Sequence, residues 1–95
     1  MTHSMKAIGV LMRTSALNGH RHAESCIDMD RGVVDLARLN EYGWSSGERV
    51  LVGLVRAFYG GWSDTDIHDI ALLDADNRRA ATLALRVWLG EEEGE

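Results

Sequence analysis

The sequence predicts an all-α protein, a small helical bundle of two repeated helix pairs, each with a short helix before a long one. Three observations lead to this prediction: polar capping residues at intervals, glycines where helices should end, and a weak internal repeat. Proline is absent, so glycine and small polar residues supply the helix boundaries. A chain of 95 residues has room for one small domain.

Residues 1–27 differ from the rest of the chain and are predicted to form an irregular segment or a short strand. They hold three of the four histidines, the single cysteine and a polar stretch at residues 14–25. The apolar run at residues 7–12 is too short for its periodicity to distinguish a strand from a helical turn. We expect this segment to be partly flexible or packed on the core.

A helical core domain is predicted over residues 28–90. Its first helix is expected to begin at Asp28 or Asp30, because a carboxylate there accepts hydrogen bonds from the free N–H groups of the first turn. This helix should run to about Glu41 and end at Gly43.

The clearest helix start in the chain is Ser45, because Glu48 completes the capping-box pattern. The helix predicted from it covers residues 46–59 and ends at Gly60 and Gly61, where glycine tolerates the left-handed C-cap conformation. Its three valines would also suit a buried strand, but the internal repeat favours a helix.

Two further helices are predicted after the polar residues 63–66. A short one should cover residues 66–72, and a long one should begin at Asp74 or Asp76 and end at Leu89 before Gly90. Residues 91–95 are then expected to form an acidic, disordered tail.

The internal repeat consists of two matches between the halves of this core. Residues 35–40 resemble residues 69–74, and residues 54–60 resemble residues 84–90, at offsets of 34 and 30. A period of this size is typical of stacked helical hairpins. Chance similarity between two amphipathic helices remains the alternative, because helical periodicity alone produces such matches.

Both long helices are predicted to carry more apolar surface than one thin core can bury. Between residues 50 and 59 only Arg56 is charged, and between residues 80 and 89 only Thr82 and Arg86 are polar. We therefore expect a homodimer, or a complex with a larger protein. Residues 1–27 folding back over the apolar surface are the alternative. The predicted interface consists of Val52, Val55, Phe58, Tyr59, Trp62, Leu85 and Trp88.

A weak candidate for metal binding lies in the N-terminal segment. His20, His22 and Cys26 place three possible zinc ligands within seven residues, but no second ligand pair follows later in the chain. We therefore expect no bound metal and no cofactor, and keep a small metal-binding protein as an alternative. No catalytic constellation is visible, so an enzyme is not predicted.

A second alternative is a nucleic-acid-associated regulator with a helix-turn-helix-like C-terminal half. Arg78 and Arg79 would lie in the first turn of the last helix, where recognition helices contact bases. The formal net charge of −5 argues against this interpretation, because an acidic protein repels phosphate.

The function predicted from these features is a small, self-associating interaction module: an adaptor, an accessory subunit or an inhibitor of a larger protein. No run approaches the roughly 20 apolar residues that a membrane span needs. One cysteine and no recognisable signal peptide favour the cytoplasm. The arginine-rich composition favours a bacterial or phage source.

Overall fold

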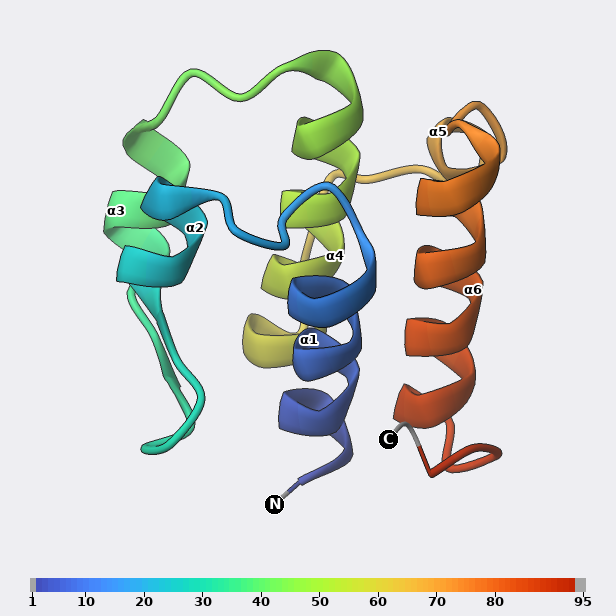
Figure 1. The fold of residues 1–95 in the computed structure, drawn as a ribbon, viewed down its shortest axis with the longest axis horizontal. Coiled ribbons are helices and arrows are strands. Elements are labelled where there is room, and N and C mark those ends of the chain that lie inside the picture. Colours follow the sequence, from blue (N-terminus) through green and yellow to red (C-terminus); the bar gives the residue numbers. More distant parts are fainter. Residues whose placement is uncertain (1, 94–95) are drawn as a thin grey trace.

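The centre of the fold is a layer of three long helices. The computed structural model describes residues 2–93, and α1 (His3–Thr14), α4 (Ser46–Gly60) and α6 (Ala75–Trp88) are the longest helices in this part of the chain. Helix α1 packs against both α4 and α6, which also contact one another (Figure 1). The all-α prediction is confirmed in this broad sense.

The N-terminal segment is not the irregular segment or short strand that the sequence predicts. Residues 3–14 form α1, whose N-cap Thr2 accepts a hydrogen bond at Oγ1 from the N–H of Met5 at 3.1 Å. Ile8 and Leu11 of this helix are fully buried. The physical reason is that α1 covers the apolar faces of α4 and α6, and this contact selects a helix where the short apolar run alone was ambiguous. Met1 lies outside the described residues.

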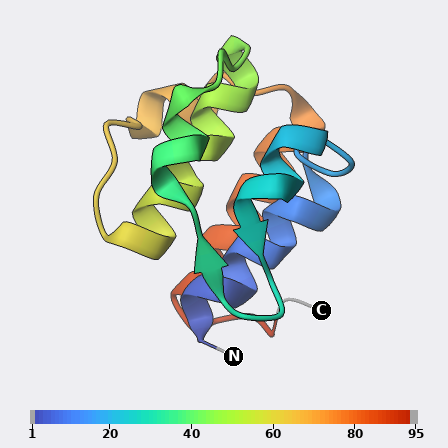
Figure 2. The ribbon, with the colours of Figure 1, turned by 90° about the vertical axis from the view of Figure 1, so that its left-hand side faces the viewer.

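A small hairpin replaces the start of the helix predicted at residue 28. After α2 (Arg21–Cys26), β1 (Ile27–Asp28) pairs antiparallel with β2 (Val33–Val34), and the two strands lie side by side in Figure 2. The Oδ1 of Asp28 accepts from the N–H of Arg31 at 3.0 Å, and Gly32 has a φ of 68°. Because Asp28 is engaged in this turn, Asp35 caps α3 (Leu36–Glu41) instead, and neither Asp28 nor Asp30 does.

The predicted boundaries of α4 are confirmed to within one residue. Ser45 accepts from the N–H of Glu48, and Glu48 accepts from the N–H of Ser45, so both halves of the capping box are present. At the other end, Gly61 has a φ of 78°, the left-handed conformation expected after a helix.

The last two helices also begin where their caps predict. Asp66 caps α5 (Ile67–Ala71), and Asp74 caps α6 by accepting from the N–H of Asn77 at 2.9 Å. Of the predicted acidic tail, Glu92 accepts from Arg86 at 2.7 Å, whereas residues 94 and 95 lie outside the described residues.

The proposed internal duplication is not confirmed by the helix boundaries. The order short helix, long helix, short helix, long helix is present in α3 to α6. However, α3 and α5 begin 31 residues apart, not the 34 of the sequence match. Asp35 is the N-cap of α3, whereas its counterpart Asp69 lies inside α5. The duplication therefore stays a prediction.

No helix among residues 2–93 is long and apolar enough to cross a membrane.

Candidate functional site

The three predicted metal ligands lie close in sequence but do not converge on one point. In α2, His22 and Cys26 are one turn apart, with 3.6 Å between Nε2 and Sγ. The same Nε2 lies 3.1 Å from the carbonyl oxygen of Arg38, so it donates there rather than offering a lone pair. His20 is the N-cap of α2 and faces α4, with its Nε2 3.6 Å from Oε2 of Glu48. Across residues 2–93, no three His, Cys, Asp or Glu side chains are placed to hold a metal ion.

The two histidine rings instead belong to an aromatic cluster that sequence reasoning missed. His22 stacks on Tyr42 with 4.3 Å between ring centroids, and His20 lies 4.8 Å from Trp44. Trp44 is buried and donates from Nε1 to the carbonyl of Leu39 at 2.7 Å. These contacts join α2 to the segment between α3 and α4, so the rings stabilise the fold by packing.

We expect chelation to leave this protein unchanged. With EDTA in excess, the unfolding temperature should match that of the untreated protein, because the histidines pack against Tyr42 and Trp44 without a metal. Differential scanning calorimetry with and without EDTA measures this. A fall of several degrees in EDTA, reversed by added zinc, would contradict the packing role.

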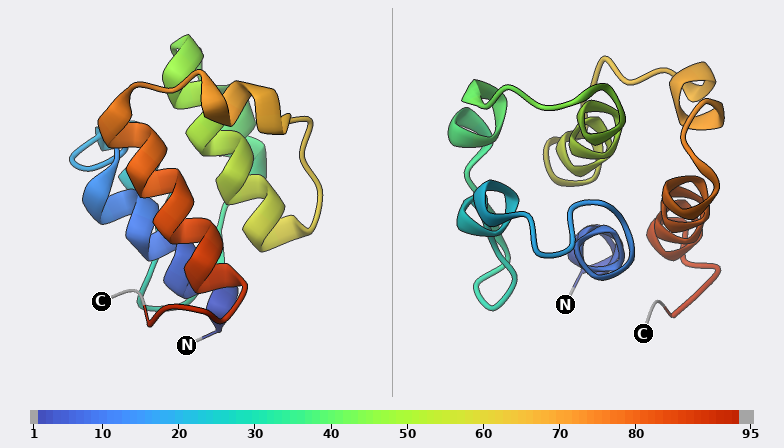
Figure 3. Two further views of the ribbon diagram at one scale, coloured as in Figure 1. Left: turned by 90° about the vertical axis from the view of Figure 1, so that its right-hand side faces the viewer. Right: turned by 45° about the horizontal axis from the view of Figure 1, so that its top comes forward.

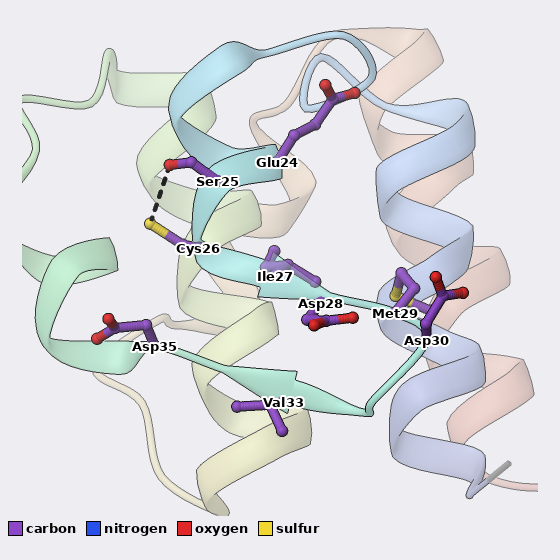
Figure 4. Close-up of a pocket in the computed structure, with 9 residues that line it drawn as sticks. All are labelled: Glu24, Ser25, Cys26, Ile27, Asp28, Met29, Asp30, Val33 and Asp35. Carbon is purple, nitrogen blue, oxygen red and sulfur yellow. Dashed lines mark hydrogen bonds between the residues drawn. The ribbon is translucent and has the colours of Figure 1, made fainter.

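A cavity of about 540 Å³ lies beside Cys26, between α2, the hairpin and the start of α3 (Figure 4). Four carboxylates line it, but Figure 4 shows them pointing in different directions rather than toward a common point. Since Cys26 itself is buried, the cavity offers neither an exposed thiol nor a converging ligand set. The carboxylates belong to Glu24, Asp28, Asp30 and Asp35.

Arg78 and Arg79, the two residues predicted to contact nucleic acid in the alternative interpretation, are exposed but already bond to other groups of the chain. Arg78 donates from Nη1 to the carbonyl of Leu73 at 2.9 Å, and Arg79 pairs with Asp76. Asp74 and Asp76 flank them at the start of α6. A phosphate approaching this end of α6 would therefore meet two carboxylates together with the two guanidinium groups.

The predicted interface residues are divided between core and surface. Val52, Val55 and Phe58 are buried within the chain, where α4 packs against both α1 and α6. These three side chains contribute to the core of the folded chain. Leu85 is half-buried, whereas Tyr59, Trp88 and above all Trp62 are exposed.

The most exposed large apolar side chains in residues 2–93 lie between α4 and α6. Ile67 is 83% exposed, Trp62 72% and Leu72 71%. All three belong to residues 61–77, which we call the 61–77 surface. Figure 3 shows this part of the chain passing along α4 to α5 and then into α6. Large apolar side chains exposed to this degree are candidates for contact with a partner.

The 61–77 surface also carries the whole net charge of the protein. It contains no lysine or arginine, and the other residues of the chain hold ten basic and ten acidic side chains. The apolar side chains therefore lie among an excess of acidic groups, of which Asp64 and Asp76 are paired with Arg56 and Arg79. The charged residues are Asp64, Asp66, Asp69, Asp74 and Asp76.

Two adjoining hollows border α5 on the side of α4. One has a volume of about 280 Å³ and the other about 270 Å³, and both are lined by Ser46, Val50 and Asp69. The first also includes Gly47, Leu72, Leu73, Asp74 and Asn77. The second also includes Arg49, Asp64 and Thr65.

The 61–77 surface is fixed to α4 by one ion pair and one close approach. Arg56, in α4, donates from Nη2 to Asp64 at 3.1 Å and from Nη1 to Asn40 at 2.7 Å. Gly53 lies about one turn before Arg56 in α4, and Thr65 packs directly against it. A Cβ added at Gly53 would overlap Oγ1 of Thr65. Residues 61–66 therefore follow a defined path despite having no helix or strand of their own.

Comparison of the chain with protein-family models, with curated proteins and with solved structures finds no match.

Proposed function

We propose that this protein is a small interaction module, an adaptor, accessory subunit or inhibitor, that binds another protein through the 61–77 surface. The observation that carries the proposal is the exposure of Ile67, Trp62 and Leu72, the three most exposed large apolar side chains of the described residues, within one short stretch of the chain. Each of these side chains exposes apolar area to water, and a bound partner would bury it.

The charge of the 61–77 surface favours a different protein over a second copy of this chain. In a symmetric dimer the same patch lies on both subunits, so Asp66, Asp69 and Asp74 would lie near their counterparts, while Asp64 and Asp76 are paired with arginines. Like charges brought together in this way oppose association. The homodimer predicted through the long helices has less support, because Val52, Val55 and Phe58 of its interface are buried in the folded chain.

Site-specific photocrosslinking tests the proposal. A photoreactive amino acid replaces Ile67 or, separately, Leu72, both of which are exposed and tolerate a larger side chain. A matched control carries it at Val33, which is 49% exposed but lies in the hairpin, away from α5 (Figure 1). Irradiated in cells of the source organism, positions 67 and 72 should give a discrete adduct with another protein.

The mass of the adduct decides between the outcomes. An adduct at positions 67 and 72 but not at 33 supports the interaction surface. An adduct of twice the mass of the chain would show that the surface binds a second copy of this chain instead of a different protein. The absence of any adduct specific to positions 67 and 72 would overturn the proposal.

We keep the cytoplasm as the proposed location, because Cys26 is the single cysteine and the fold uses no disulfide. The nucleic-acid alternative has weaker support, since Arg78 and Arg79 already bond to Leu73 and Asp76. The metal-binding alternative is weakened by the hydrogen bond from His22 to Arg38.

A further inference from the structure

We infer that the partner presents a basic amphipathic segment, which places an apolar side chain in the hollow beside Leu72 and basic side chains on the aspartates around it. The inference rests on the proposed function and names the chemistry of the ligand. It is carried by the position of the two hollows relative to the charges of the 61–77 surface.

The hollow beside Leu72 provides the apolar contact. Val50, Leu72 and Leu73 supply apolar side chains to its lining, and its volume is about 280 Å³. A protein cavity of roughly 150 Å³ lined by apolar side chains is enough to bind benzene. The hollow therefore has room for one large aliphatic or aromatic side chain, which would cover the exposed part of Leu72.

The aspartates place negative charge on both sides of this contact. Asp74 lines the first hollow, Asp64 the second, and Asp69 lines both. Asp64 is already paired with Arg56, and Arg49 also lines the second hollow, so a lysine or arginine next to the inserted side chain would bind Asp69 or Asp74. Hydrogen bonds between oppositely charged groups are stronger than neutral ones, so this arrangement selects for basic neighbours.

The shape of the site favours a polypeptide over a small molecule or a phosphate-bearing surface. The two hollows adjoin along α5, so a ligand that fills one can extend into the other. Nucleic acids and anionic membranes present phosphate, which five aspartates repel. An amphipathic segment with apolar side chains on one face and basic side chains beside them satisfies both the shape and the charge.

Fluorescence anisotropy with a labelled synthetic peptide tests the inference. The probe is a short amphipathic peptide of leucine and lysine, with its leucines at helical spacing. The comparison peptide has glutamate in place of lysine. At about 150 mM NaCl, exposed charges further apart than about 8 Å are screened, so short-range contacts dominate the signal. The lysine peptide should bind the wild-type protein and the glutamate peptide should not.

The charge variant is Asp66→Asn combined with Asp74→Asn. Both residues are N-caps, and asparagine caps helices as well as aspartate does, so the variant should keep α5 and α6 intact. Its matched control is Glu91→Gln with Glu93→Gln, which removes the same charge outside the 61–77 surface. Affinity for the lysine peptide should fall on the order of fivefold in the first variant and stay unchanged in the second.

The apolar contact is tested by Leu72→Ser, with Leu89→Ser as its control. Both leucines are more than half exposed, but Leu89 follows the end of α6 and lines neither hollow. Leu72→Ser should weaken binding on the order of tenfold, and Leu89→Ser should leave it unchanged. Equal weakening by the test and control variants, or equal binding of both peptides, would overturn the inference.

The failures of the inference and of the proposed function are distinguishable. Photocrosslinking at positions 67 and 72 could capture a protein whose crosslinked segment lacks lysine and arginine. That result would support the interaction surface and contradict the inference of a basic partner. If no adduct forms at either position, the proposed function itself fails.

Discussion

Replacing Leu11 by alanine is expected to lower the free energy of unfolding by about 3 kcal/mol. Leu11 is fully buried in α1, the helix that packs against both α4 and α6. The substitution leaves a cavity at the centre of the three-helix layer, where the neighbouring helices cannot close over it without moving. Urea denaturation followed by circular dichroism measures the loss.

The matched control lies in the same helix. Thr14 is exposed at the end of α1, and Thr14→Ala removes only its hydrogen bond to the carbonyl of Val10. It should change the free energy of unfolding by no more than about 0.5 kcal/mol. Similar small effects for Leu11→Ala and Thr14→Ala would mean that residues 3–14 lie loosely on the surface, contrary to the structure.

The second large change in the free energy of unfolding is expected when Gly53 is replaced by alanine. An alanine Cβ there overlaps Oγ1 of Thr65 and lies 2.9 Å from Thr65 Cβ and 3.1 Å from Ser63 Oγ. Alanine favours a helix over glycine by about 1 kcal/mol, but overpacking against the 61–66 segment costs more. We expect Gly53→Ala to lower the free energy of unfolding by about 2 kcal/mol net. Urea denaturation again measures the change.

The control for Gly53 is Gly47, near the start of the same helix. A Cβ at Gly47 meets no atom within 4 Å, so Gly47→Ala should raise the free energy of unfolding by about 0.5 kcal/mol. Adding Thr65→Gly to Gly53→Ala should restore much of the lost stability, because it removes both overlapping atoms. If Gly53→Ala and Gly47→Ala change stability in the same direction, the close approach of the two segments is wrong.

The contact between Gly53 and Thr65 is expected to affect partner binding as well as stability. Thr65 lies between Trp62 and Ile67 in the chain, so moving it shifts the apolar side chains of the 61–77 surface. A partner that needs Ile67 and Leu72 in their present positions should bind Gly53→Ala less tightly than the wild-type protein. Peptide anisotropy on the variant and the wild-type protein compares them directly.

Helix starts were predictable where a side chain caps the backbone beside it. Ser45 with Glu48, Asp66 and Asp74 each bond to an N–H two or three residues away, and no distant part of the chain is needed. The helix start predicted at Asp28 was wrong, because an aspartate side chain accepts backbone hydrogen bonds in a β-turn as well as at a helix N-terminus. The next glycine, Gly32, was the signal for the hairpin turn.

The candidate site was predictable only in part. Trp62 was expected at an interface and is exposed, and the concentration of aspartates in residues 61–77 is visible in the sequence. Ile67 and Leu72 were not among the predicted interface residues. Their exposure depends on how α5 lies beside α4 and packs against α6, which no local pattern encodes (Figure 3).

The sequence by itself determined the helical class, the capped starts of α4, α5 and α6, and the location of the net charge. These depend on hydrogen bonds between near neighbours and on composition. Only the tertiary structure decided that residues 3–14 form a helix, that Val52, Val55 and Phe58 are buried, and that Ile67 and Leu72 remain exposed. Burial depends on which distant segment covers an apolar face, and periodicity shows only that such a face exists.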